Sequence, residues 1–176
     1  KATPGFVANR IGCFALQHVL WLTVETGLGF DEVDALTGAA MGRPKSGTFR
    51  LADIVGVDLL AQIARNLSGE LAHDEQAAVF RLPGFVEEMV RRGWWGAKRG
   101  QGFYQRVKGA QGSEVLTLDP ATMAYRPRRE AAFPSLAGVA KTADPAARLR
   151  ALCAAGDGAG AFAWKHLSAV LCYAAN

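Results

Sequence analysis

The sequence predicts a mainly α-helical domain with one small β-hairpin. Half of the 176 residues are hydrophobic and a fifth are charged, a balance typical of a globular domain with a sizeable core. Apolar residues recur at helical spacing in several stretches, which are separated by short segments rich in Gly, Pro and Asp. Segments typical of strands occur only between residues 103 and 126.

The first helix is expected to lie at the centre of the domain. Thr3 is a suitable N-cap and Pro4 suits the first helical position. The residues that follow, to about Gly27, are apolar around most of the helix circumference, which is typical of a buried helix. Asp31 is then expected to cap a short helix that ends near Ala40.

The remaining elements follow from capping residues and turn residues. Residues 42–47 are expected to form a loop, and residues 127–142 a basic, loop-like segment. Asp119–Pro120 is expected to join two strands as a hairpin, residues 114–118 and 123–126. Further helices are expected over residues 48–55, 58–68, 83–93, 146–155 and 161–176.

Composition argues against several classes of protein. The formal net charge is +4, and Lys and Arg occur as scattered pairs, so we expect no nucleic-acid partner. Cys13, Cys153 and Cys172 lie in apolar stretches without CxxC spacing, which favours buried free thiols in a reducing compartment. The apolar stretch 11–24 is shorter than the roughly 20 residues of a membrane span, and no signal peptide is visible. We therefore expect a cytoplasmic protein.

Two patterns suggest cofactor or metal sites, and both are rejected. Residues 156–161 match the G-x-G-x-x-A dinucleotide fingerprint, but a helix leads into them where a strand is needed. We interpret them as an inter-helix loop, so this chain is not expected to bind NAD. His18, His73 and His166 show none of the spacings of metal or nucleophile motifs, and we expect them to be structural, with no metal bound.

Four segments, in order, resemble the C-terminal domain of 3-hydroxyacyl-CoA dehydrogenases. They are T-P-G-F-V-A-N-R-I at 3–11, G-F-D-E-V-D at 29–34, G-T-F-R-L-A-D-I-V-G-V-D at 47–58 and W-G-A-K-R-G-Q-G-F-Y at 95–104. The resemblance covers residues 1 to about 106. It implies a helical bundle of the 6-phosphogluconate dehydrogenase C-terminal-like type, which acts as the substrate domain of an NAD-dependent enzyme of fatty-acid β-oxidation.

The resemblance also implies site residues. Asn9 matches the active-site asparagine of the family, and its place in the first turns of a helix suits the stabilisation of negative charge. Ser46, Thr48 and Phe49 are candidates for lining the acyl pocket, although turn and packing roles explain them equally well. The family's serine and histidine–glutamate pair belong to an NAD-binding domain that would precede Lys1. The isolated chain is therefore expected to be inactive.

The division of the chain follows from the same resemblance. The Thr48–Phe49–Arg50 form is closer to long, multidomain members of the family than to single-function ones. Residues 162–167 resemble the start of a second helical copy, with Lys165 in the position of Asn9. We expect a helical domain over 1–108, a linker with a hairpin over 109–145, and the start of a degenerate second copy over 146–176. The opening at Lys1 and the uncapped end at Asn176 suggest a piece of a longer polypeptide.

Two alternatives stay open at this point. The chain could be a non-catalytic assembly module whose last helix exposes an apolar face, Phe162, Leu167, Val170 and Leu171, and forms a homo-oligomer. It could also belong to a related 3-hydroxyacid dehydrogenase that acts on a free acid. Competition between CoA esters and free acids would separate this second alternative from an acyl-CoA enzyme.

Overall fold

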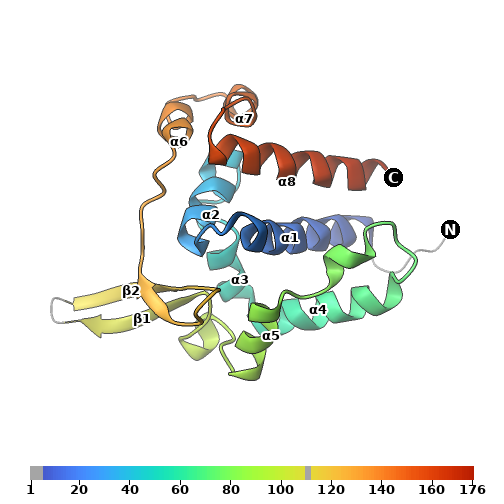
Figure 1. Ribbon diagram of the computed structural model, residues 1–176, viewed down its shortest axis with the longest axis vertical. Helices are drawn as coiled ribbons and strands as arrows, with labels where there is room; N and C mark the ends of the chain where they lie inside the picture. Colours follow the sequence, from blue (N-terminus) through green and yellow to red (C-terminus); the bar gives the residue numbers. More distant parts are fainter. Residues whose placement is uncertain (1–5, 110–111) are drawn as a thin grey trace.

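The computed structural model describes residues 6–109 and 112–176, a helical body from which a small sheet projects (Figure 1). The α-helices are α1 (Val7–Thr26), α2 (Phe30–Thr37), α3 (Phe49–Val55), α4 (Val57–Glu70), α5 (Gly84–Arg91), α6 (Pro134–Val139), α7 (Pro145–Cys153) and α8 (Gly158–Ala175). Short 3₁₀ helices occur at η1 (Ala39–Met41), η2 (Ala77–Phe80) and η3 (Ala97–Arg99). The predicted fold class is confirmed.

The sheet is antiparallel and has the order β1 (Tyr104–Gly109), β2 (Gly112–Leu118) and β3 (Tyr125–Pro127). The expected hairpin is confirmed, because Leu118 pairs with Tyr125 across the turn that begins at Asp119. The sequence indicated only the start of β1, at residues 103–104. Its pairing with β2, in which Tyr104 lies opposite Thr117, adds the third strand.

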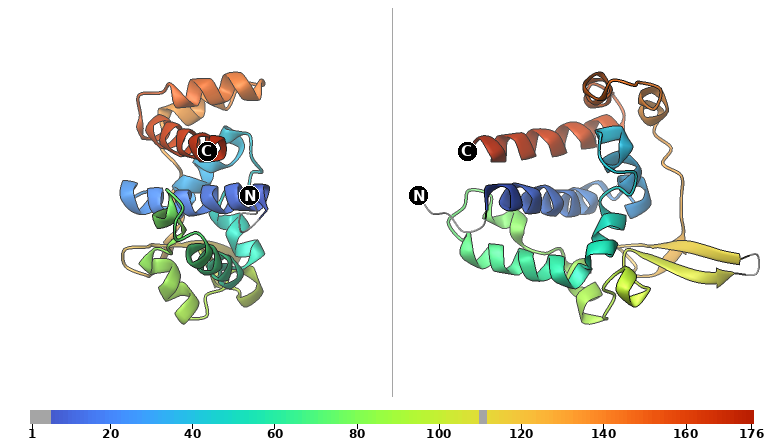
Figure 2. Two further views of the ribbon diagram at one scale, coloured as in Figure 1. Left: turned by 90° about the vertical axis from the view of Figure 1, so that its right-hand side faces the viewer. Right: turned by 180° about the vertical axis from the view of Figure 1, so that it is seen from behind.

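Helix α1 forms the middle layer, between α8 on one side and α4 on the other (Figure 2). It begins at Val7, because Phe6 has extended backbone angles. The expected cap, Thr3 with Pro4, lies outside the described residues. The largest hydrophobic cluster joins residues of α1 to α5 and of both long strands with residues of α6, α7 and α8. The segments expected as 1–108 and 146–176 therefore share one core.

The buried carboxylate of Asp34 caps α3 from a distance. Thr48 occupies the N-cap position of α3 but makes no side-chain cap. Instead, the Asp34 carboxylate in α2 accepts the N–H groups of Phe49 at 2.6 Å and Arg50 at 3.0 Å. It also accepts the phenol of Tyr104 at 2.6 Å. Burial raises the pKa of Asp34 to about 6, so the group is ionised at neutral pH and binds all three donors.

A second buried carboxylate, Asp53, ties α3 to the sheet. It accepts the backbone N–H groups of Phe103 at 2.8 Å and Tyr104 at 2.9 Å. Burial also raises the pKa of Asp53 to about 6. Gly102 is required here, because a Cβ at this position would lie 2.1 Å from an Asp53 carboxylate oxygen. The two carboxylates thus connect α2, α3 and β1 through Tyr104.

Helix α8 packs antiparallel on α1. Lys165 near the middle of α8 pairs with Glu25 near the end of α1, and Tyr173 near the end of α8 accepts a hydrogen bond from Arg10 at 2.6 Å. Arg10 also forms an ion pair with Asp74, whose carboxylate is buried, and Asp74 accepts the Tyr173 phenol at 3.1 Å. Polar contacts near the middle and near the C-terminal end of α8 therefore fix this helix to α1.

Two histidines and an arginine form a hydrogen-bonded chain at the middle of this interface. The Nδ1 atoms of His18 and His166 are 3.3 Å apart, and Arg43 Nη2 lies 3.0 Å from His166 Nε2. Arg43 can only donate, so His166 Nε2 accepts, its proton lies on Nδ1, and His18 Nδ1 accepts in turn. Both imidazoles are neutral in this arrangement. Burial, with smaller contributions from Arg43 and His18, lowers the pKa of His166 to about 3.

Three local expectations were wrong. Asp31 does not cap α2, since the Glu32 carboxylate accepts the Gly29 N–H at 2.8 Å, while Asp31 binds Arg126 at 3.0 Å. The segment 127–142 was expected to be loop-like but contains α6, whose last residue, Val139, is buried in the hydrophobic core. The three cysteines are free thiols, but none is fully buried, since Cys13 and Cys153 are half-buried and Cys172 is exposed.

The apolar face of α8 is also placed differently from the expectation. Phe162 is buried in the core, and Leu167 and Val170 are partly buried against the rest of the chain. Only Leu171 of the expected set is exposed, at 69%, together with Trp164 at 63%. The helix therefore uses most of its apolar surface inside this chain.

Replacing Asp34 by Ala should lower the free energy of unfolding by about 3–5 kcal/mol, because it leaves three buried donors unpaired at about 1–3 kcal/mol each. Tyr104→Phe removes only one of these hydrogen bonds and should cost about 1–2 kcal/mol. Urea unfolding followed by far-UV circular dichroism measures both. Equal losses in the two variants would contradict a capping role for Asp34.

Acid should weaken the protein through His166. Its pKa is about 3 in the folded chain and about 6.5 when unfolded, so the unfolded state binds the extra proton between these values. Stability is thus complete above pH 6.5 and falls as the pH drops towards 3, by up to about 1.4 kcal/mol per pH unit. His166→Gln keeps an acceptor for Arg43 but does not titrate. Urea unfolding at pH 7, 6, 5 and 4 should show a shallower loss in this variant, and parallel curves would refute the assignment.

Candidate functional site

Two cavities adjoin along α1 and form one groove. The first, of about 600 Å³, is lined by Ala8, Asn9, Arg10, Gly12, Cys13, Leu16, Leu60, Ile63, Asn66, Leu67 and Glu70. The second, of about 390 Å³, is lined by Gly12, Ala15, Leu16, Arg43, Pro44, Gly47, Thr48, Leu51, Ala52, Val55 and Leu60. We call this continuous space the α1 groove. Three residues border both cavities, Gly12, Leu16 and Leu60.

The walls of the α1 groove are mostly apolar. Asn9, Gly12 and Leu16 are three and four residues apart, so they lie on one face of α1. Leu51 and Val55 of α3 border the groove with 45% and 44% of their surface exposed. Apolar side chains left open in a concave surface are typical of a site for an apolar ligand.

Gly12 deepens the floor of the groove. A Cβ at this position would meet no atom within 4 Å, so the space above it is open. Glycine in a helix interior destabilises the helix by roughly 0.5–1 kcal/mol relative to alanine, and no packing contact compensates for that here. An exposed glycine inside a long apolar helix was the signal in the sequence for this groove, and sequence reasoning missed it.

Asn9 stands at the open end of the groove. It is the third residue of α1 and is exposed, in the turn whose N–H groups lack partners within the helix. The structure records no hydrogen bond from its carboxamide to any described residue. The side chain is thus placed to bind a ligand group, and the positive end of the helix dipole favours a negative one.

The other candidate residues divide into two groups. Thr48 lines the groove, and its hydroxyl donates to the Thr37 hydroxyl at 2.8 Å, which fixes the side chain against α2. Ser46 belongs to the same loop, is partly exposed and does not line the groove. Phe49 is wholly buried and packs on the rings of Phe30 and Phe103, behind the groove wall. Asn9 and Thr48 therefore share the groove, while Ser46 and Phe49 do not border it.

Close packing holds the loop that carries these residues. Gly47 has a positive φ of 70°, and a Cβ there would lie 2.6 Å from backbone atoms of Asp34. The Gly47 N–H also donates to the Pro44 carbonyl at 3.1 Å, which closes the turn. The loop is thereby fixed on α2 next to the Asp34 carboxylate, so the groove wall at Thr48 is preformed.

Burial shifts the pKa of two further side chains that line the groove. Burial raises the pKa of Cys13, so its thiol stays protonated and is a poor nucleophile. Burial lowers the pKa of Arg43, whose guanidinium borders the second cavity while it contacts His166. Arg43 was not singled out in the sequence, because nothing in its Gly- and Pro-containing neighbourhood distinguishes it from a surface arginine.

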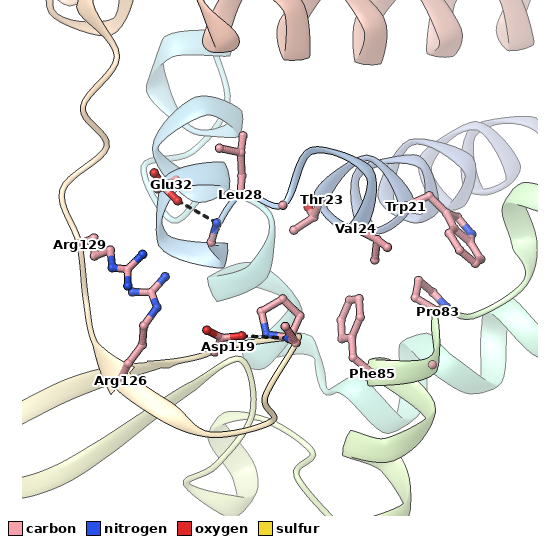
Figure 3. Close-up of a pocket in the computed structure, with 15 residues that line it drawn as sticks. Trp21, Thr23, Val24, Leu28, Glu32, Pro83, Phe85, Asp119, Arg126 and Arg129 are labelled. Carbon is pink, nitrogen blue, oxygen red and sulfur yellow. Dashed lines mark hydrogen bonds between the residues drawn. The ribbon is translucent and has the colours of Figure 1, made fainter.

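A separate cavity of about 440 Å³ lies at the other end of α1 (Figure 3). Arg126 and Arg129 lie on one side of it, and Trp21, Pro83 and Phe85 on the other (Figure 3). The charge of Arg126 is already compensated, because the guanidinium makes two 3.0 Å hydrogen bonds to the buried Asp31 carboxylate. We therefore take the α1 groove as the candidate site.

The described chain offers no place for a nicotinamide cofactor of the familiar kind. The segment 156–161 was expected as an inter-helix loop, but only residues 156–157 lie between α7 and α8, while Gly158 and Gly160 belong to the first turn of α8. Helix α7 leads into this segment, where the dinucleotide fingerprint needs a strand. Within residues 6–109 and 112–176, no three His, Cys, Asp or Glu side chains are placed to bind one metal ion. None of the helices in the described part of the chain is long and apolar enough to cross a membrane.

Comparison with known proteins identifies relatives along the whole chain. A probable 3-hydroxyacyl-CoA dehydrogenase of Bacillus subtilis is 39% identical over 176 residues, which is all of this chain and 22% of the relative. A probable 3-hydroxyacyl-CoA dehydrogenase of Deinococcus radiodurans is 39% identical over 127 residues, 71% of this chain and 36% of the relative. A Rickettsia prowazekii protein named as a fatty acid oxidation complex trifunctional enzyme is 29% identical over 127 residues, 71% of this chain and 18% of the relative.

The chain thus spans between about a fifth and a third of the length of these relatives. No solved structure matches it significantly. The family model for the 3-hydroxyacyl-CoA dehydrogenase C-terminal domain matches residues 5–106, more than half of the chain, and this range includes all residues that line the groove, from Ala8 to Glu70. With its mainly helical fold and four ordered motifs, the chain belongs to the 3-hydroxyacyl-CoA dehydrogenase C-terminal domain family.

Proposed function

We propose that this chain is the substrate domain of an NAD-dependent 3-hydroxyacyl-CoA dehydrogenase of fatty-acid β-oxidation, and that the α1 groove holds the acyl group. The observation that carries the proposal is the continuous apolar groove with Asn9 at its end. The parent enzyme would oxidise the 3-hydroxyl of an acyl-CoA, with NAD⁺ as the hydride acceptor. NAD would bind an upstream domain of the same polypeptide. That domain is the proposed partner with which this chain forms the active site.

Asn9 is proposed to act on the reacting end of the substrate. Its carboxamide can donate a hydrogen bond to the substrate oxygen or to a side chain of the upstream domain. Its position in the first turn of α1 adds the unpaired N–H groups and the helix dipole, which favour negative charge on that oxygen. Asn9 would therefore orient the substrate and stabilise charge, while proton removal falls to the upstream domain.

The groove beyond Asn9 is proposed to bind the acyl chain. Gly12 and Leu16 form its floor, and Leu51 and Val55 its far wall. Thr48 borders this space, and its hydroxyl is held by Thr37, so it would act as a fixed wall. Ser46 and Phe49 are proposed to act on the acyl site only indirectly. Ser46 belongs to the loop beside the groove, and the buried ring of Phe49 supports the groove wall from behind.

Residues 109–145 are proposed as a linker with the small sheet, and 146–176 as the start of a second copy of the helical domain. In support, residues 162–167 of α8 resemble the start of α1 in sequence, and α8 packs antiparallel on α1. Lys165, at the position that matches Asn9, forms a surface ion pair with Glu25 and lies outside the groove. The second copy would thus be structural. A parent enzyme of this class is proposed to work in the cytoplasm.

Self-association is a second candidate role for α8. Trp164 and Leu171 are exposed on this helix, and the expected apolar face is otherwise covered. Two exposed apolar residues are a small patch for a stable interface, so we place this role after substrate binding.

The central test is the oxidation of NADH with acetoacetyl-CoA by the protein extended upstream through its NAD-binding region. Asn9→Ala should lower kcat/KM by about 10²-fold, the loss typical of one donor to a transition-state oxyanion. Gly12→Leu should raise KM for long-chain substrates, because its side chain fills the open space on the groove floor. Gly69→Leu is the matched control, since Gly69 is also helical, exposed and free of neighbours within 4 Å but does not line the groove.

The outcomes separate the parts of the proposal. Activity that is indifferent to Asn9→Ala would keep the reaction and remove Asn9 from it. Equal effects of Gly12→Leu and Gly69→Leu would reject the groove as the acyl site. An inactive extended protein would reject the dehydrogenase function, and NAD-dependent turnover by the 176-residue chain alone would overturn the expectation that it is inactive.

A further inference from the structure

Arg43 is a partly buried cation whose charge is not compensated within the described chain. The ion pairs of residues 6–109 and 112–176 include no carboxylate within 4 Å of its guanidinium. Its recorded side-chain hydrogen bond goes to His166, which is neutral in the chain of tautomers derived above. Burial lowers its pKa, and no carboxylate acts in the opposite direction.

Two of the other partly buried arginines of the fold, Arg10 and Arg126, have carboxylate partners. Arg10 binds the buried carboxylate of Asp74, and Arg126 binds that of Asp31 at 3.0 Å. Burying a cation without a partner costs free energy, which explains why these pairs exist. Arg43 has no such partner, although it lines the second cavity of the α1 groove, whose walls are mostly apolar.

The contact with His166 orients Arg43 without neutralising it. A guanidinium has five N–H donors, and only Nη2 is engaged by the His166 ring. The imidazole is wholly buried between α1 and α8, so it holds one edge of the guanidinium in place. The other N–H groups have no hydrogen bond recorded to a described residue, and they remain for a ligand.

We propose that Arg43 binds an anionic oxygen group of the ligand in the α1 groove, a carboxylate or a phosphate. The proposal rests on the function proposed above and specifies its substrate class. If the anion is a carboxylate at the far end of the acyl chain, the substrates are acyl-CoA esters of dicarboxylic acids. If it is a phosphate of the CoA moiety, Arg43 recognises acyl-CoA esters in general.

The layout of the groove favours the carboxylate. Asn9 borders only the first cavity and Arg43 only the second, with Gly12 and Leu16 between them. A rise of 1.5 Å per residue places Leu16 about 10 Å beyond Asn9 along α1, a distance that suits a medium-length acyl chain. With the reacting carbon at Asn9, the acyl tail runs towards Arg43. The CoA phosphates lie on the other side of the thioester, away from it.

The test is isothermal titration calorimetry of the 176-residue chain with three probes. Decanoyl-CoA carries an uncharged chain end, and the CoA monothioester of sebacic acid has the same ten carbons with a terminal carboxylate. Decanoyl-pantetheine lacks the CoA phosphates. Arg43→Gln removes the charge and keeps donors for His166. Arg150→Gln, at an exposed site on α7 outside the groove, is the matched control for loss of one positive charge. Circular dichroism checks that both variants are folded.

We expect the wild-type chain and Arg150→Gln to bind the sebacic thioester about tenfold more tightly than decanoyl-CoA, as a charge-assisted arginine–carboxylate contact predicts. Arg43→Gln should abolish this preference, because the sebacic thioester loses about tenfold more affinity than decanoyl-CoA does. If Arg43→Gln instead weakens decanoyl-CoA but not decanoyl-pantetheine, anion binding by Arg43 holds and the anion is a CoA phosphate.

Two results would overturn the inference, and they differ in what else they reject. If all probes bind equally to the wild-type chain and to Arg43→Gln, Arg43 recognises no anion, while the acyl groove stands. If no probe binds the wild-type chain, the proposed function of the groove fails, and the inference fails with it.

Discussion

The fold depends most on two buried carboxylates that satisfy backbone N–H groups far from them in the sequence. Asp34 caps α3, which has seven residues and no side-chain cap of its own, and Asp53 fixes the start of β1. Tyr104 binds to both, through its phenol and through its N–H. Because each unpaired buried donor costs about 1–3 kcal/mol, the contacts of both carboxylates fix the relative places of the three elements.

Close packing against the same two aspartates, mostly against their backbone atoms, explains the glycines in the family motifs. A side chain at Gly47 would collide with Asp34, and side chains at Gly96 and Gly102 would collide with Asp53. The motif at 47–58 and the motif at 95–104 are therefore two halves of one packing unit. The loop that closes the α1 groove is built on this unit, so the structural network determines where Thr48 and Arg43 stand relative to Asn9.

Helix α8 connects the later part of the chain to that groove. His166 of this helix accepts a hydrogen bond from Arg43, and its other ring nitrogen is hydrogen-bonded to His18. A segment that carries none of the proposed reacting groups can thus still fix the position of a ligand-binding side chain. The contact between α8 and α1 therefore does more than bury apolar area, because it also orients a side chain of the groove.

The sequence by itself determined the fold class, most helix boundaries to within a few residues, the turn at Asp119 and the family, because these depend on local periodicity, turn chemistry and short ordered motifs. It also identified Asn9 and Thr48 as candidates, which the fold brings to one groove. It placed Phe49 at the pocket, yet the ring lies in the core, because burial of a side chain is decided by what packs around it. Only the tertiary structure determined the caps made by Asp34 and Asp53, the burial of Phe162, and the chain from His18 to Arg43. Each of these is a contact between residues 15 to 148 positions apart, and no local pattern encodes such a contact.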